Sequence, residues 1–177
     1  MFRAFCILTC LAAPAWCQEF FTLKGHGGPI MDIAVSPSGQ IATASFDNSV
    51  GAWSDGVPFW FDGHEAAVTA LAFMDDNAII SGGDDFTLRA WSQRDPDRPR
   101  IIGKHQAKIT AIAISVKGDV ATASWDATIG LWSPDGTVKF LKGHQQGVND
   151  VAFNADGTRV YSASTDGTVR ILSLIHI

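Results

Sequence analysis

The chain has 177 residues and a net charge of −5, with 13 lysines and arginines against 18 aspartates and glutamates. This acidic balance disfavours nonspecific nucleic-acid binding, which depends on basic side chains that neutralise phosphates. The cysteines are Cys6, Cys10 and Cys17, all near the N-terminus, so the remainder of the chain does not rely on disulfide bonds.

Residues 1–17 are typical of a secretory signal peptide, with a short basic start, an apolar core and small residues at the exit. The apolar core, residues 4–13, is too short to cross a membrane. The alternative is a lipid anchor at Cys17, which is not expected because Trp16 occupies the position where a lipobox has glycine or alanine. The leader predicts an exported protein, periplasmic or extracellular, without a membrane span.

The rest of the chain repeats one pattern. Gly-His or Lys-His dipeptides place four histidines 38, 41 and 39 residues apart, a period typical of repeat proteins. In the first three repeats an aspartate follows the histidine after 21 residues and a tryptophan after 27, and a serine or threonine comes four residues before the aspartate. The predicted sets are His26, Thr43, Asp47 and Trp53; His64, Ser81, Asp85 and Trp91; His105, Thr122, Asp126 and Trp132; and His144, Ser162 and Asp166, with Leu172 where tryptophan is due.

Short runs rich in β-branched and aromatic residues follow each histidine. Ile30–Val35 and Val68–Phe73 are bounded by turn residues, and the runs 40–45, 48–53 and 57–61 continue the first repeat. Their length of about five residues is usual for strands. No segment has a helical period, so the sequence predicts an all-β chain of four four-stranded units.

The order of these motifs resembles the WD-repeat β-propeller family: Gly-His, an apolar strand, [TS]-x-x-x-D-x-[TS]-[VIL], then tryptophan. The leader adds a resemblance to exported bacterial members. The resemblance implies a β-propeller domain over residues 18–171. Its four blades are expected at about 20–56, 57–95, 96–136 and 137–171. Family members generally close with seven blades, so we expect a C-terminally truncated part of a seven-bladed ring.

Two segments depart from the repeat. The residues Gln93–Arg100 lengthen the second spacing and are expected to form a polar connector. The last six residues, 172–177, do not continue the repeat and resemble the translation of a sequencing adapter. We therefore expect this tail to be foreign to the protein.

The resemblance implies a structural role for the recurring polar residues. The tryptophan N–H reaches the hydroxyl, the hydroxyl bonds the histidine, and the histidine bonds the aspartate. A metal site, or a catalytic triad of Ser81, His64 and Asp85, is the alternative. A catalytic site is needed only once, whereas these residues recur in every repeat, and the acidic pairs lack calcium-loop spacing. The sequence therefore predicts neither an enzyme nor a metal site.

The resemblance also implies that the narrow end of the propeller binds protein partners through two innermost-strand positions and one position before the turn aspartate. Phe46 and Trp125 stand out there, because aromatic residues dominate protein interfaces. The candidate partner-binding residues are Met31, Phe46, Thr69, Asp84, Lys108, Thr110, Trp125, Asn149 and Thr165.

Three functions remain open at this point. The first is a non-catalytic protein-interaction scaffold in the periplasm or outside the cell. The second is the N-terminal propeller of an exported c-type cytochrome, which would need haem c in a missing C-terminal domain. The third, a hydrolase-like propeller, lacks a non-repeating cluster of acids and bases. No C-x-x-C-H motif occurs in the chain, so no cofactor is expected in these residues.

Overall fold

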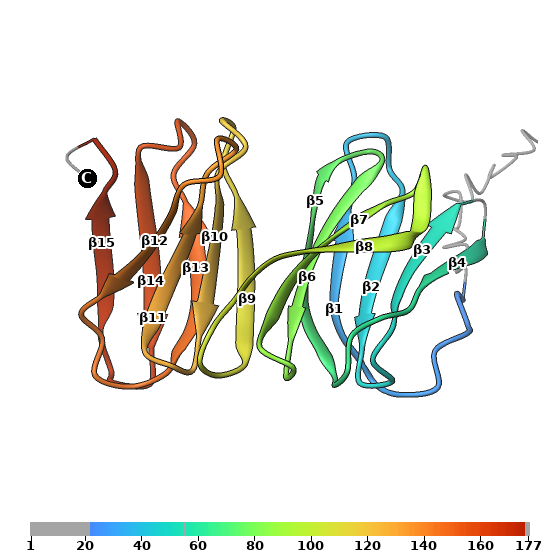
Figure 1. Ribbon diagram of the computed structural model, residues 1–177, viewed down its shortest axis with the longest axis horizontal. Helices are drawn as coiled ribbons and strands as arrows, with labels where there is room; N and C mark the ends of the chain where they lie inside the picture. Colours follow the sequence, from blue (N-terminus) through green and yellow to red (C-terminus); the bar gives the residue numbers. More distant parts are fainter. Residues whose placement is uncertain (1–21, 55, 176–177) are drawn as a thin grey trace, which may run out of the picture.

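The computed structural model describes residues 22–54 and 56–175, which form fifteen β-strands and no helix. The strands form four antiparallel sheets that follow one another from blue to red in Figure 1. The all-β prediction is confirmed. The strands are β1 (Ile30–Val35), β2 (Ile41–Ser45), β3 (Val50–Ser54) and β4 (Val57–Phe61) in the first sheet; β5 (Val68–Asp75), β6 (Ala78–Gly83), β7 (Thr87–Ser92) and β8 (Asp95–Lys104) in the second; β9 (Ile109–Ile114), β10 (Val120–Ser124), β11 (Thr128–Trp132) and β12 (Val138–Lys142) in the third; and β13 (Val148–Phe153), β14 (Arg159–Ser164) and β15 (Val169–Ser173) in the fourth.

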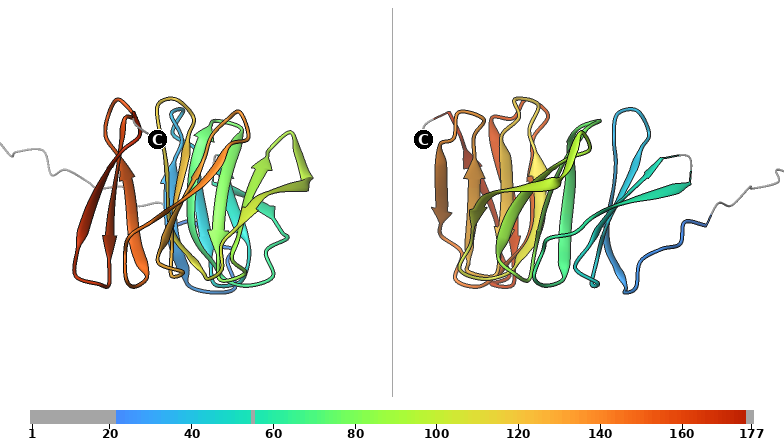
Figure 2. Two further views of the ribbon diagram at one scale, coloured as in Figure 1. Left: turned by 60° about the vertical axis from the view of Figure 1, so that its left-hand side comes forward. Right: turned by 45° about the vertical axis from the view of Figure 1, so that its right-hand side comes forward.

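Each sheet is a meander in which consecutive strands pair. The first strands of the sheets, β1, β5, β9 and β13, contact one another in that order, and the sheets fan outward from them (Figure 2). Each of the first three sheets takes its last strand from the start of the following sequence repeat. For example, Val57–Phe61 pairs with β3 although it precedes the second Gly-His. A sheet is therefore displaced from a sequence repeat by one strand.

The apolar core lies between neighbouring sheets. Trp91 of the second sheet packs on the first, with its ring 5.6 Å from Phe61, and Trp132 of the third sheet packs on Leu88 of the second. Both tryptophans are buried. Truncation of a buried tryptophan to alanine typically costs about 3–5 kcal/mol, so these contacts are a main source of stability.

In the fourth sheet Leu172 occupies the place of the tryptophan. It pairs with Val160, as Trp132 pairs with Val120. Leu172 and Leu174 pack against the core between the third and fourth sheets. Residues 172 and 173 thus belong to β15, residues 174 and 175 follow it, and the foreign origin of the tail stays a prediction. Residues 176–177 and the predicted leader, residues 1–17, lie outside the described residues.

The expectation of a polar connector at Gln93–Arg100 is wrong. Most of this segment belongs to β8, a strand of ten residues, Asp95–Lys104, which pairs with β7. The pairing shifts register twice, between Leu88 and Arg89 and between Ala90 and Ser92. Bulges of this kind absorb extra residues without ending a strand, which the spacing alone did not reveal.

The turn between the second and third strand of every sheet contains one residue in the left-handed conformation. This residue is Asn48, Phe86, Ala127 or Gly167, with φ of 72°, 69°, 66° and 80°. Alanine and phenylalanine pay a steric cost in this region that glycine does not. The second and third turns are therefore strained by their own sequence.

We expect Ala127→Gly to raise the free energy of unfolding by about 1 kcal/mol, because the strain of the Cβ at positive φ exceeds the added entropy of the unfolded chain. Urea titration of the variant measures the change. Gly167→Ala, at the equivalent turn, should lower stability by a similar amount. An unchanged midpoint for both variants would contradict the strain.

Candidate functional site

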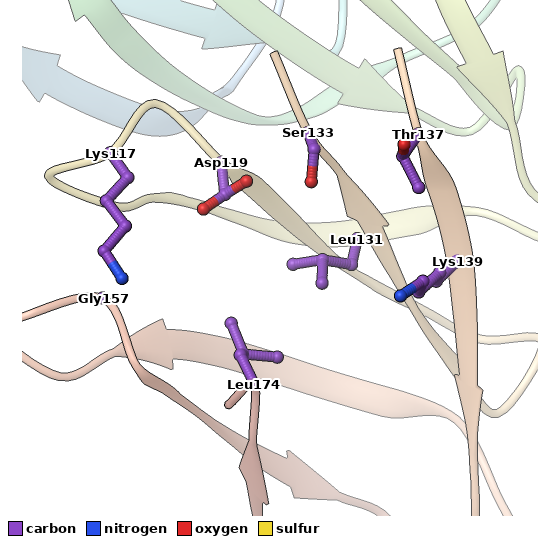
Figure 3. A pocket seen from close by; sticks show the side chains of 8 residues that line it. All are labelled: Lys117, Asp119, Leu131, Ser133, Thr137, Lys139, Gly157 and Leu174. Atoms are coloured by element: carbon purple, nitrogen blue, oxygen red, sulfur yellow. The ribbon is translucent and has the colours of Figure 1, made fainter. Parts of the chain in front are cut away.

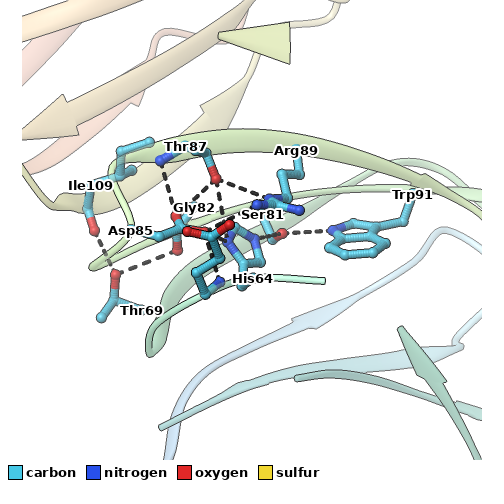
Figure 4. A network of polar contacts seen from close by, with 10 residues as sticks. His64, Thr69, Ser81, Gly82, Asp85, Thr87, Arg89, Trp91 and Ile109 are labelled. Atoms are coloured by element: carbon cyan, nitrogen blue, oxygen red, sulfur yellow. Dashed lines mark hydrogen bonds and ion pairs between the residues drawn. The ribbon is translucent and has the colours of Figure 1, made fainter. Parts of the chain in front are cut away.

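The polar residues predicted for the second repeat meet at one end of its sheet (Figure 4). His64 Nδ1 lies 2.8 Å from Asp85 Oδ2, and His64 Nε2 lies 2.7 Å from Ser81 Oγ. The Trp91 indole N–H donates to the same Ser81 oxygen at 2.7 Å. Since Ser81 accepts from the indole, its own hydrogen points to Nε2, and the histidine donates through Nδ1 to the aspartate.

The same arrangement recurs in the other repeats. The histidine–aspartate distances are 3.0, 2.8 and 2.9 Å for His26–Asp47, His105–Asp126 and His144–Asp166. The histidine–hydroxyl distances are 2.7, 2.7 and 2.9 Å to Thr43, Thr122 and Ser162. Trp53 and Trp132 donate to Thr43 and Thr122 at 2.9 and 3.0 Å. The fourth network has no tryptophan member.

One further residue belongs to each network and was not among the predicted sets. The hydroxyl two residues after the aspartate donates to its Oδ1, as Thr87 does to Asp85 at 2.8 Å. Burial raises the pKa of Asp85, but hydrogen bonds from His64 and Thr87 outweigh it and hold that pKa well below its usual range. The motif D-x-[TS] carried this signal. The equivalent residues are Ser49, Thr128 and Thr168.

One neighbour of the network varies between repeats. In the first sheet Gly51 leaves room for the Trp60 ring, which lies 4.7 Å from the His26 ring; a Cβ at Gly51 would come 2.9 Å from that indole. In the second sheet Arg89 holds the equivalent place and pairs with Asp85 at 3.4 Å. Either an aromatic ring or a guanidinium thus covers the histidine.

The Ser81 hydroxyl is not placed to act as a nucleophile. Ser81 is fully buried, and its oxygen is occupied by Trp91 and His64. A substrate carbonyl could not reach this oxygen without opening the sheet. No group of three histidine, cysteine, aspartate or glutamate side chains in the described part of the chain is arranged to hold a metal ion.

The candidate partner-binding residues lie at the end of the sheets that carries the histidine and aspartate turns, which we term the narrow face. Four of these residues sit at β-bulges where the first strand of each sheet shifts register against the second: Met31, Thr69, Thr110 and Asn149. A bulge re-aims the side chain that it carries. The bulge was not visible in the sequence pattern.

The two bulge threonines are engaged within the fold. Thr69 donates its hydroxyl hydrogen bond to the carbonyl oxygen of Ile109 at 2.5 Å, and Thr110 to that of Val148 at 2.6 Å. Each bond joins one sheet to the first strand of the next. The structure therefore uses Thr69 and Thr110 as links between sheets, whereas Met31 and Asn149 are exposed.

The turn positions of the narrow face form a second group, which we call the turn row: Phe46, Asp84, Trp125 and Thr165. Phe46 and Trp125 are 53% and 52% exposed. The Lys108 Nζ lies 3.7 Å from the centre of the Trp125 ring, within cation–π range. Asp84 is half-buried, and its Oδ1 has no hydrogen-bond partner among the described residues.

We expect His64→Ala to lower the free energy of unfolding by roughly 1–3 kcal/mol, because Ser81 and Asp85 lose their partner in a buried setting. Chemical denaturation of both proteins measures the difference. Glu65→Ala, at the exposed neighbouring residue, serves as the control and should have little effect. A loss below a few tenths of a kcal/mol for His64→Ala would refute the network.

His105 should make stability depend on pH. Burial lowers the pKa of His105, and the hydrogen bond that His105 donates to Asp126 offsets this only in part. Between about pH 6.5 and the lower folded value the unfolded chain binds more protons, so stability falls on acidification, by up to about 1.4 kcal/mol per pH unit. Urea titrations at pH 7 and pH 5 measure this loss. His105→Gln should reduce it, and an equal loss in that variant would contradict the assignment.

The comparisons with known proteins agree with the repeated geometry. The family model "WD domain, G-beta repeat" matches four times, at residues 17–54, 58–92, 98–133 and 135–173. The ribosome biogenesis protein YTM1 of Eremothecium gossypii is 29% identical over 148 residues, covering 74% of this chain and 33% of the relative.

Two further relatives carry other names. Periodic tryptophan protein 2 of Arabidopsis thaliana is 28% identical, with 90% of this chain and 24% of the relative covered. The guanine nucleotide-binding protein subunit beta of Oryza sativa subsp. indica is 27% identical, with coverage of 89% and 47%. The chain thus spans about a quarter to a half of the length of these relatives.

The relatives overturn the predicted location. YTM1 from several yeasts is named for ribosome biogenesis. Ribosomes are not assembled in the periplasm or outside the cell, so the expectation of an exported protein is wrong. The relatives named here are eukaryotic and give no support to an exported bacterial subtype or a fused cytochrome. No helix in the described part of the chain is long and apolar enough to span a membrane. The four family matches and the four repeated sheets together show that this chain belongs to the WD-repeat family.

Proposed function

We propose that this chain is a non-catalytic scaffold that binds protein partners through its narrow face. The observation that carries the proposal is the turn row. Phe46 and Trp125 occupy the same repeat position in the first and third sheets and expose about half of their side chains. The equivalent position between them, in the second sheet, is Asp84.

The chemistry of the turn row suits a peptide. Exposed aromatic side chains on a rigid sheet lose little entropy on binding and bury a large area. The Asp84 Oδ1 is removed from solvent and lacks a hydrogen-bond donor among the described residues. A buried acceptor without a partner is costly, so an N–H of a bound segment that reached it would gain more than an exposed hydrogen bond.

Backbone hydrogen bonds fix the turns that carry Phe46 and Trp125. The Phe46 amide donates to the carbonyl oxygen of Pro29 at 2.9 Å, and the Trp125 amide to that of Lys108 at 3.0 Å. The histidine networks fix the adjacent aspartates. The aromatic side chains are therefore presented on turns that are already ordered, which lowers the cost of binding.

The relatives support binding and suggest where a partner is to be sought. One relative is named as a subunit, and several are named for ribosome biogenesis. Components of ribosome assembly are therefore the first proteins to test as partners. Hydrolysis is not proposed, because Ser81 is sealed inside the sheet.

The test is selection of a random-peptide phage library on the purified chain, followed by measurement of the affinity of the selected peptides. Phe46→Ala and Trp125→Ala should each weaken binding by about tenfold or more, as for central aromatic residues of interfaces. Val57→Ala and Val116→Ala are the controls, since both valines are exposed and lie at the opposite end of the sheets. Peptides that bind both aromatic variants as well as the original chain would overturn the proposal.

A further inference from the structure

Three lysines lie at the narrow-face ends of the second and third sheets. Lys104 ends β8, Lys108 precedes β9, and Lys142 ends β12. Within the described residues, no carboxylate oxygen lies within 4.0 Å of any of these ammonium groups. On a chain of net charge −5, three such lysines at the same end of two neighbouring sheets form a local field of opposite sign. We call Lys104, Lys108 and Lys142 the basic edge.

Two members of the basic edge depart from the repeat. Lys104 stands where the other three repeats have the glycine of Gly-His. Gly63 and Gly143 have φ of 154° and 155°, which favours glycine, whereas Lys104 is not in this region. The third repeat moves its glycine one residue earlier, to Gly103, where a Cβ would collide with the Trp132 ring. The backbone at position 104 therefore does not need a glycine, and the fold does not require a lysine there.

Lys108 is the second departure. Its equivalents in the other repeats are Pro29, Ala67 and Gly147, which are small or uncharged. Residues that recur in every repeat serve the shared fold, so charged residues that occur in one repeat alone are the better candidates for binding. Trp125, which Lys108 covers, belongs to the same sheet.

A pocket of about 500 Å³ lies between two of the lysines. Lys104 and Lys142 line it together with Phe140, a residue that is 43% exposed and whose ring centre lies 5.2 Å from that of His105. Asp126 also lines the pocket, but its oxygens accept hydrogen bonds from His105, Gln106 and Thr128. The Lys104 and Lys142 side chains thus line the pocket beside one aromatic ring, Phe140, without a carboxylate partner within 4.0 Å among the described residues, and the Lys104 Nζ also lies 5.9 Å from the centre of the Phe86 ring.

The opposite end of the third sheet has a different arrangement of charges. Lys117 and Lys139 line another pocket there, but Asp119 shares it with them (Figure 3). Hydrogen bonds from Thr137, with a smaller contribution from the charge of Lys139, lower the pKa of Asp135. Lysines at that end thus have acidic neighbours, which the basic edge lacks apart from the engaged Asp126.

We propose that the basic edge binds an acidic segment of a partner protein, with carboxylates at Lys104 and Lys142 and an apolar side chain on Phe140. This inference rests on the proposed scaffold function and names the chemistry of the partner. The lysine–aromatic pair of Lys108 and Trp125 connects the basic edge to the turn row, so one segment can contact both. A nucleic acid fits less well, because its affinity comes from many phosphate contacts and the chain as a whole repels a long polyanion.

The experiment measures fluorescence anisotropy of three labelled probes with the full chain: a glutamate-rich peptide with one leucine, its glutamine counterpart, and an oligouridylate of equal length. We expect only the glutamate peptide to bind well, and its affinity to fall as salt increases, because the contacts are exposed ion pairs. Lys104→Glu with Lys142→Glu should weaken it by about tenfold or more. Lys117→Glu with Lys139→Glu makes the same change in net charge and should alter the affinity by less than about twofold.

Several results would overturn the inference. Tighter binding of the oligouridylate would point to nucleic acid, and equal losses in both double variants would show a nonspecific effect of net charge. If the glutamate peptide fails to bind while library peptides still depend on Phe46 and Trp125, the acidic partner is wrong and the scaffold function stands. If both experiments fail, both proposals fall. Lys104→Gln with Lys142→Gln, checked by thermal unfolding, guards against misfolding of the glutamate variant.

Discussion

Each sheet of this chain buries one of its apolar faces by packing against the next sheet. A four-stranded sheet alone would leave Trp91 and Val68 in water, whereas the first sheet covers them with Phe61 and small alanines. The same contact recurs between the second and third sheets through Trp132. Stability in such an array is close to a sum over neighbouring units and their interfaces, so the identity of each interface residue matters locally.

The polar networks depend on this packing and in turn fix the loops. The tryptophan that packs on the preceding sheet also donates its N–H to the buried hydroxyl, as Trp91 does to Ser81. The hydroxyl orients the histidine, and the histidine holds the aspartate of the turn. The apolar interface is thereby coupled to the conformation of the narrow face. A substitution in the core is therefore expected to alter the conformation of the turns that carry Phe46 and Trp125.

Residues that recur in every repeat can be distinguished from residues that occur in one repeat, and the two groups serve different purposes in this molecule. The histidine, hydroxyl and aspartate recur with nearly the same distances in every repeat, as expected of residues that maintain the fold. Thr69 and Thr110, which the sequence predicts to bind partners, join neighbouring sheets through their hydroxyl hydrogen bonds. In contrast, Lys104, Lys108 and Trp125 occur once each, Lys104 at the end of the second sheet and the other two in the third sheet. Binding specificity in a repeat protein resides in such departures, because the shared positions are constrained by the fold.

The sequence by itself determined the all-β class, the period and the order of the strands, because turn residues and short β-rich runs act over a few neighbouring residues. The positions of the four histidine networks followed from the same period. Only the tertiary structure decided that residues 95–104 form one bulged strand, since a bulge depends on the pairing partner and not on local sequence. It alone brought Lys104 and Lys142 to one pocket, because they are distant in sequence and meet only where two outer strands end at the same side of neighbouring sheets.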